Sequence, residues 1–121
     1  MFRTVLALSS TVLLMVSGAT PAGALSSFCH PNHVCMWEHS AYFGSKYVNR
    51  LAVSGVFDIG MWDGDNEISS LSNTSNCTIT LHDNDSPQSS TRHWVFLPYD
   101  DQPDLKVWGA NDDAESFTVR C

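Results

Sequence analysis

A short internal duplication constrains the fold of this chain more than any other feature. Residues 58–71 read DIGMWDGDNEISSL and residues 104–117 read DLKVWGANDDAESF. The ungapped alignment places Asp58 over Asp104, Trp62 over Trp108 and Ser70 over Ser116. A repeat of this kind indicates units that bury their apolar faces against each other. We therefore divide the chain into a first half of about 29–75 and a second half of about 76–121.

The first 24 residues have the form of a signal peptide. Arg3 precedes an apolar run over residues 5–17, and Ala22-Gly23-Ala24 provides the small residues of a cleavage site. The run is short for a bilayer span, so an N-terminal membrane anchor is the less favoured alternative. We predict cleavage after Ala24 and secretion to the extracellular space. Removing 24 of the 121 residues leaves 97, enough for one small domain, 25–121, with a modest core.

Four cysteines lie in the exported part of the chain. An even number in an oxidising compartment favours disulfides over metal thiolates or a catalytic thiol. Three pairings are possible; proximity favours Cys29 with Cys35, which leaves Cys77 with Cys121. On a chain-entropy model these bridges would stabilise the fold by about 2 and about 4 kcal/mol, because the second closes the longer loop.

The charge of the mature chain excludes several partners. Loss of Arg3 leaves five Lys and Arg residues against 13 Asp and Glu, a net charge of −8 with neutral histidines. Such a surface repels nucleic-acid phosphates and anionic membranes, so we expect neither as a partner. It is compatible with calcium, with basic partners, or with solubility alone.

The mature chain is predicted to be all-β. No long stretch has helical periodicity without breakers, whereas short alternating segments are bounded by turn residues. We predict strands within or near residues 28–37, 45–49, 51–57, 77–82, 93–97 and 116–121, a polar connector at 71–76, and polar loops at 83–92 and 98–103. Short strands at this spacing favour a sandwich or a barrel.

An aromatic motif follows the first cysteine pair. Trp37, Tyr42 and Gly44 have the spacing W-x4-Y-x-G. This spacing suits a folded hairpin in which two rings stack over a turn, with the glycine supplying a positive φ. In the second half the corresponding positions are Leu81 and then Asp85 to Gln88, with neither aromatic nor glycine. We expect a redesigned loop there.

These motifs together resemble the βγ-crystallin fold. More narrowly, CMWEHSAYFG, DNEISSLSN and NDDAES resemble secreted bacterial peptidase inhibitors with that fold, whose founding members block metallopeptidases. The resemblance covers residues 29–121 and implies two four-stranded Greek-key motifs packed as a sandwich. It also implies a binding protein rather than an enzyme, with no catalytic residues.

The DNEISS turn at residues 65–70 fits the calcium signature of that fold, (N/D)(N/D)xx(S/T)S. The resemblance implies a first calcium site made by the Glu67 carbonyl, the Ser69 hydroxyl and the Asp112 carboxylate. It implies a second site made by Asn66, Asp113 and Glu115, although the signature has serine or threonine where Glu115 stands. Calcium accepts carboxylate oxygens in flexible sets of ligands. The alternative is a turn whose Asp and Ser side chains satisfy backbone groups without a metal.

Inhibition needs a rigid, exposed segment that docks in a peptidase cleft. Residues 83–92, with Arg92, and residues 98–103 are candidates, and the sequence does not decide between them. We do not expect a zinc site, since the spacings of His30, His33 and His39 match neither a structural zinc site nor a helical catalytic pair.

The leading hypothesis is a secreted, monomeric, non-enzymatic inhibitor of an extracellular peptidase. Two alternatives come from other classes. One is a calcium-stabilised structural or stress module without a peptidase target. The other is an antimicrobial, toxin-like module.

Overall fold

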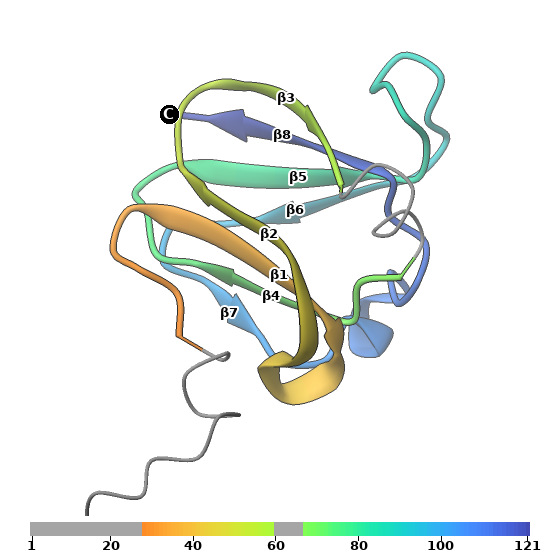
Figure 1. The fold of residues 1–121 in the computed structure, drawn as a ribbon. Coiled ribbons are helices and arrows are strands. Elements are labelled where there is room, and N and C mark those ends of the chain that lie inside the picture. The colour runs from red at the N-terminus through yellow and green to blue at the C-terminus, as the bar shows by residue number, and fades with distance from the viewer. Residues whose placement is uncertain (1–27, 60–66) are drawn as a thin grey trace, which may run out of the picture.

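A computed structural model describes residues 28–59 and 67–121, and these form two four-stranded antiparallel sheets (Figure 1). The predicted signal peptide lies outside the described residues, as do Asp65 and Asn66. The strands are β1 (His33–His39), β2 (Phe43–Leu51), β3 (Gly55–Asp58), β4 (Ser70–Asn73), β5 (Thr78–His82), β6 (His93–Phe96), β7 (Asp101–Gln102) and β8 (Ser116–Arg120), with 3-10 turns η1 (Ser40–Tyr42) and η2 (Leu105–Trp108). The predicted all-β class is confirmed. In this part of the chain no helix is long and apolar enough to cross a membrane.

The two sheets exchange strands between the halves. One sheet has the order β2-β1-β4-β7 and the other β3-β8-β5-β6. Each sheet therefore takes three strands from one half and one from the other. β3 crosses from the first half to pair with β8, and β7 crosses from the second half to pair with β4 (Figure 1). The predicted Greek-key sandwich of two four-stranded motifs is confirmed.

The hydrophobic core lies between the sheets. In β5, Ile79 and Leu81 are fully buried whereas Thr78 and Thr80 are half-buried, as expected for a strand with one face on the core. In β1 the central residues are buried on both faces: Val34 and Met36 belong to the core, whereas Cys35 is bonded to Cys29 and Trp37 packs against Tyr42 on the other face. Buried side chains of both sheets form one cluster that includes Val34, Met36, Ile68, Leu71, Ile79, Leu81, Phe96, Phe117 and Val119.

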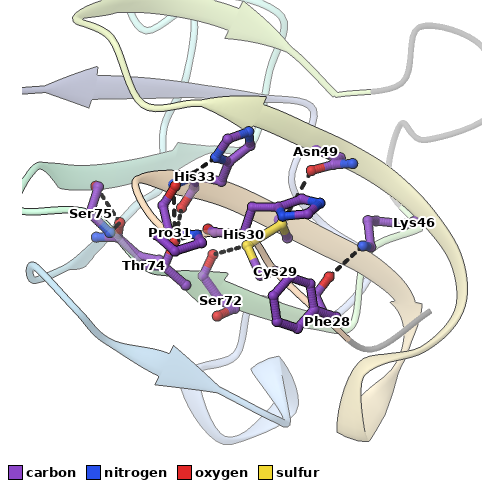
Figure 2. Close-up of a disulfide and its surroundings, with 12 residues drawn as sticks. Phe28, Cys29, His30, Pro31, His33, Lys46, Asn49, Ser72, Thr74 and Ser75 are labelled. Carbon is purple, nitrogen blue, oxygen red and sulfur yellow. Dashed lines mark hydrogen bonds between the residues drawn. A yellow bond between two sulfur atoms is a disulfide. The ribbon is translucent and has the colours of Figure 1, made fainter. Parts of the chain in front are cut away.

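The four cysteines form the two disulfides that proximity in the sequence favours. Cys29 bonds to Cys35 across a separation of 6 residues, and Cys77 bonds to Cys121 across 44. Figure 2 shows the surroundings of the first bridge. Lys46 Nζ donates to the Phe28 carbonyl at 2.6 Å on one side of it. The local bridge thus closes the segment that leads into β1.

The structure corrects the prediction made for residues 71–76. The expected connector at 71–76 is wrong for its first part, since Ser70–Asn73 is β4 and all four residues are buried. These side chains are buried because they find partners; for example, the Ser72 hydroxyl donates to the Asp101 carboxylate.

Two further strand boundaries differ from the prediction. The strand expected at 51–57 is two pieces, because β2 ends at Leu51 and β3 begins at Gly55. The loop expected at 98–103 contains β7. Its two residues pair with Leu71 and Ser72 of β4, a contact far away in the sequence.

The aromatic motif builds the link between β1 and β2. The Trp37 and Tyr42 rings meet edge to face, with centroids 5.1 Å apart, and Gly44 has φ +82°. Ser70 supports this corner from β4: its hydroxyl donates to the His39 carbonyl at 2.7 Å and accepts the Tyr42 N–H at 3.2 Å. Both features of the predicted hairpin, the ring stack and the positive φ, are present.

The corner of the second half is displaced by one residue from its predicted position. Trp37 pairs with Ser70, and His82 pairs with Ser116, the duplicate of Ser70. His82, rather than Leu81, is therefore the counterpart of Trp37. Ser116 repeats the role of Ser70, because its hydroxyl donates to the carbonyl of Asn84 in the adjoining loop at 2.6 Å.

Candidate functional site

A surface pocket of about 420 Å³ lies where the two halves meet at one end of the sandwich. Its lining residues come from the end of β1, the segment before β4 and the segment before β8: Glu38, His39, Glu67, Ser69 and Asp112. Folding thus brings the three residues of the predicted first calcium site to one pocket, although Glu67 and Asp112 are 45 positions apart in the sequence.

Backbone hydrogen bonds hold the two walls of this pocket. The Ser69 N–H donates to the Trp37 carbonyl at 2.8 Å, and the Ser69 carbonyl accepts the Leu105 N–H at 2.9 Å. The Asp112 N–H donates to the Ile68 carbonyl at 3.0 Å. Across the pocket the Ser69 hydroxyl donates to Asp112 Oδ1 at 3.4 Å. The hydroxyl and the carboxylate therefore face each other on a fixed frame.

The chemistry of the pocket suits a hard cation. Its donors include the hydroxyl of Ser69 and carboxylates, and calcium is bound by oxygen ligands of these kinds. Glu38 adds a carboxylate that the sequence did not reveal, and its Oε1 accepts the Ser45 N–H at 3.3 Å. Across residues 28–59 and 67–121, no three His, Cys, Asp or Glu side chains gather as a metal centre. A cation here would therefore need hydroxyl and backbone oxygens as well.

The predicted second site is only partly described. Asn66 lies outside the described residues, whereas Asp113 and Glu115 are in the turn before β8. Nη1 of the Arg92 guanidinium lies 3.3 Å from the Asp113 carboxylate. The Glu115 N–H donates to the His82 carbonyl at 2.9 Å. This turn thus has a positive side chain of the protein beside it.

The loop at 83–92 is closed by its first residue. The Asp83 carboxylate accepts the N–H groups of Thr91 at 2.9 Å and Arg92 at 3.1 Å. It also lies 3.4 Å from Arg92 Nε. The hydrogen bond from the Arg92 backbone, with those from Thr91, holds the pKa of Asp83 well below its usual range. Arg92, the basic residue of this candidate docking loop, is engaged with two carboxylates.

Two histidines that the sequence did not single out lie at the base of the same loop. Nδ1 of His82 is 2.6 Å from Nδ1 of His93, and His82 Nε2 is 2.7 Å from the Thr118 hydroxyl. Burial, followed by the charge of His93, lowers the pKa of His82. The register of β5 and β6 makes this pair, since His82 lies directly opposite His93.

The three histidines considered for zinc do not form one cluster. The rings of His30 and His33 are 5.6 Å apart near the first disulfide (Figure 2). His39 is at the far end of β1, in the pocket described above.

Solved structures with a similar fold are βγ-crystallin domains. A structure from work on the evolution of the eye-lens βγ-crystallin domain fold matches with a TM-score of 0.63 and 19% identity, over 77% of this chain and 90% of that one. A domain from Clostridium beijerinckii matches with a TM-score of 0.58 and 20% identity, over 73% and 97%. A βγ-crystallin from Ciona intestinalis matches with a TM-score of 0.57 and 20% identity, over 73% and 99%. At these identities the likeness shows the fold.

Sequence comparison gives the family. No curated protein sequence shows a significant match. The model of peptidase inhibitor family I36 matches residues 22–96, more than half of the chain. A family of inhibitors on a crystallin fold is non-enzymatic. The chain belongs to peptidase inhibitor family I36.

Proposed function

We propose that the protein is secreted and inhibits an extracellular metallopeptidase by stoichiometric binding as a monomer. The observation that carries this proposal is the family match over residues 22–96. The disulfide-braced sandwich supports it, because a rigid scaffold loses little entropy when it docks. Two disulfides and the signal-peptide pattern support export. The metallopeptidase class follows from the resemblance of the motifs to inhibitors of that class.

Titration against a peptidase panel tests this function. The purified chain from residue 25 onward is added in increasing amounts to thermolysin-type metallopeptidases and to subtilisin-type serine peptidases. We expect residual metallopeptidase activity to fall linearly to an end point near one inhibitor per enzyme. The same chain, reduced and alkylated, is the control and should lose inhibition. Inhibition of serine peptidases alone would overturn the class, and full activity across the panel would overturn the function.

A second role, calcium binding, is favoured by the pocket at the meeting of the halves. We propose that Glu67, Ser69 and Asp112 provide oxygen ligands for one calcium ion. Asn66, Asp113 and Glu115 would form a separate second site, which is the less favoured of the two. The support is that the first three residues line one pocket. A bound ion would join the segment before β4 to the segment before β8. The guanidinium of Arg92 beside Asp113 disfavours a second ion, so we expect one per chain.

Thermal unfolding with and without calcium tests this role. A ligand that binds only the folded state stabilises it, by about 2.7 kcal/mol at about 100 times its dissociation constant. We expect millimolar calcium to raise the Tm, and both Ser69→Ala and Asp112→Ala to remove most of the gain. Asp85→Ala, an exposed carboxylate in the 83–92 loop, is the matched control and should keep the gain. An unchanged Tm for the natural chain would favour a turn that holds no metal.

A further inference from the structure

The connection from β6 to β7 carries an exposed apolar tip. The tip, defined as Leu97-Pro98-Tyr99, leaves the side chain of Leu97 64% exposed and that of Tyr99 67% exposed. Large apolar side chains are costly to leave in water, and a rigid exposed group of them is typical of a contact surface. The tip lies at the opposite end of the molecule from the 83–92 loop (Figure 1).

The backbone around the tip is held by Asn73, the last residue of β4, and by Ser75 in the segment after it. The Leu97 carbonyl accepts a hydrogen bond from Asn73 Nδ2 at 3.1 Å. The Tyr99 N–H donates to the Ser75 carbonyl at 3.0 Å, and the Asp100 carbonyl accepts the Asn73 N–H at 3.0 Å. Three backbone groups within four residues are therefore fixed, while the side chains of the tip remain free to contact a partner.

Asn73 is the centre of this support. It is only 1% exposed, and its Nδ2 donates to the Cys77 carbonyl at 2.8 Å as well as to Leu97. Its Oδ1 accepts from the Ser75 N–H at 3.1 Å and the Ser75 hydroxyl at 2.6 Å. Both donors and the acceptor of this carboxamide are thus in use. The network ends at Cys77, which the disulfide to Cys121 anchors.

The conformation of the tip differs from that of an extended peptidase substrate. Peptidase clefts bind the cleaved segment as an extended strand, which has strongly negative φ. Tyr99 has φ +59°, so the chain turns out of an extended path at that residue. The Leu97–Pro98 bond is a tertiary amide without the N–H that a strand-like complex would use. The tip can present apolar side chains without lying in the cleft as a substrate.

The 83–92 loop is less suited to this role. Its exposed residues are polar and mostly short: Asn84, Asp85, Gln88, Ser89, Thr91 and Arg92. Its basic residue, Arg92, is held by the carboxylates of Asp83 and Asp113. To enter a pocket that selects basic side chains, Arg92 would first have to give up both ion pairs.

We propose that the Leu97-Pro98-Tyr99 tip enters the cleft of the target peptidase, and that the specificity pocket of this target takes a large apolar side chain. This assignment rests on the inhibitory function proposed above. The binding energy comes from burial of Leu97 and Tyr99, and preorganisation by Asn73 limits the entropy lost.

Inhibition constants of surface variants test the assignment. Leu97→Ala and Tyr99→Ala are measured against a peptidase that the natural chain inhibits, and each should weaken inhibition by about 10-fold to 100-fold. Val107→Ala removes another exposed apolar side chain, 82% exposed on η2, and Gln88→Ala alters the 83–92 loop. Both controls should stay within about twofold of the natural chain. Unimpaired tip variants would overturn the assignment alone, whereas a natural chain that inhibits nothing would overturn the proposed function and the assignment with it.

Limited proteolysis tests the rigidity of the tip without relying on inhibition. Chymotrypsin prefers large apolar residues in its primary pocket, so Tyr99 is a suitable site when the chain is unfolded. We expect mass spectrometry to find no cleavage after Tyr99 in the natural chain under conditions that cut the reduced, alkylated chain completely. Asn73→Asp, which removes both side-chain donors, should expose the site while far-UV circular dichroism remains unchanged. Rapid cleavage after Tyr99 in the natural chain would overturn the preorganised tip.

Discussion

The two corners of the molecule occupy equivalent backbone positions but have opposite chemistry. In the first half Trp37 stacks edge to face on Tyr42, with centroids 5.1 Å apart. In the second half His82 occupies the position of Trp37 and stacks edge to face on His93, with centroids 4.8 Å apart. Two rings are thus in contact at both corners, those of tryptophan and tyrosine in the first and of two histidines in the second. One corner is built on aromatic packing, and the other on a hydrogen-bonded histidine pair.

The chain around each corner follows the same difference. The link from β1 to β2 is the short turn η1, whereas β5 and β6 are joined by the ten residues 83–92. The Ser70 hydroxyl donates to a backbone carbonyl beside the first link, and the Ser116 hydroxyl donates to a backbone carbonyl in the second. The longer link adds its own polar closure between Asp83 and Arg92. A polar network has therefore taken the place of aromatic packing in the second half.

Removal of the inner ring from each corner should produce the largest difference. Trp37 is fully buried, so Trp37→Ala should lower the free energy of unfolding by about 3–5 kcal/mol. His82→Ala removes a smaller ring and leaves the Thr118 hydroxyl without its partner, which should cost about 1–3 kcal/mol. Urea unfolding at pH 7.5, monitored by circular dichroism, measures both. Equal losses would show that the histidine corner supports the fold as strongly as the tryptophan corner.

The glycine of the first corner provides a smaller but sharper test. Gly44 has φ +82°, and an added Cβ would lie 2.6 Å from His39 Cδ2 and 3.1 Å from Glu38 Cβ. Gly44→Ala should therefore cost about 2–4 kcal/mol, from left-handed strain and crowding together. Gly109 is the matched control, since its φ is +71° but nothing lies within 4 Å of an added Cβ. Gly109→Ala should cost only about 1–2 kcal/mol. Similar losses in thermal unfolding would mean that crowding at the first corner is readily relieved.

Acidification should destabilise the second corner and give the smallest effect. Burial and the neighbouring His93 lower the pKa of His82, while the Asp83 carboxylate opposes them. Below the ordinary pKa of 6.5, the unfolded chain then binds a proton that the folded chain resists. The free energy of unfolding should be highest above that pH and fall as the pH drops toward the folded pKa of His82.

A His82→Gln variant separates this effect from general acid destabilisation. The Thr118 hydroxyl, which is hydrogen-bonded to His82 Nε2, carries no charge that could change in this pH range. The pKa of Asp83 is lowered too, and its contribution is lost only at more acidic pH. The variant should therefore show a flatter stability profile between about pH 7 and 5 than the natural chain. Parallel stability profiles for the variant and the natural chain would show that the histidine pair does not cause the pH dependence.

Local patterns in the sequence were sufficient for the fold but not for every element. Alternation in Thr78–His82 and the W-x4-Y-x-G motif report directly on one strand and one turn, so both were predictable. β4 was missed in part because Ser72 and Asn73 look like loop residues until their buried partners are known. β7 was missed because two residues carry no periodicity, and their strand is defined by β4.

The candidate sites show the same limit. The resemblance of the DNEISS turn to the calcium signature pointed to Ser69 and Asp112, which do share a pocket. Glu38 could not be found in this way, because it belongs to a different segment that folding brings alongside. The support of the tip by Asn73 was also hidden, since its bonds to Leu97 and Asp100 span more than 20 residues. Contacts that depend on tertiary pairing leave no local mark in a single sequence.

The crossing of β3 into the second sheet has a consequence for how the chain reaches its fold. Phe57 of β3 pairs with Phe117 of β8, which lies 60 residues further along the chain. β3 is at the edge of its sheet, so β8 is its only neighbour among the described strands. The ladder that holds β3 cannot form until residues 116–119 are present. Non-local pairings of this kind slow folding because a large loop must close before any contact rewards it. A chain in which β8 has not yet formed therefore leaves β3 and β5 without their shared partner, and pairing of β8 joins a strand of the first half to the sheet of the second.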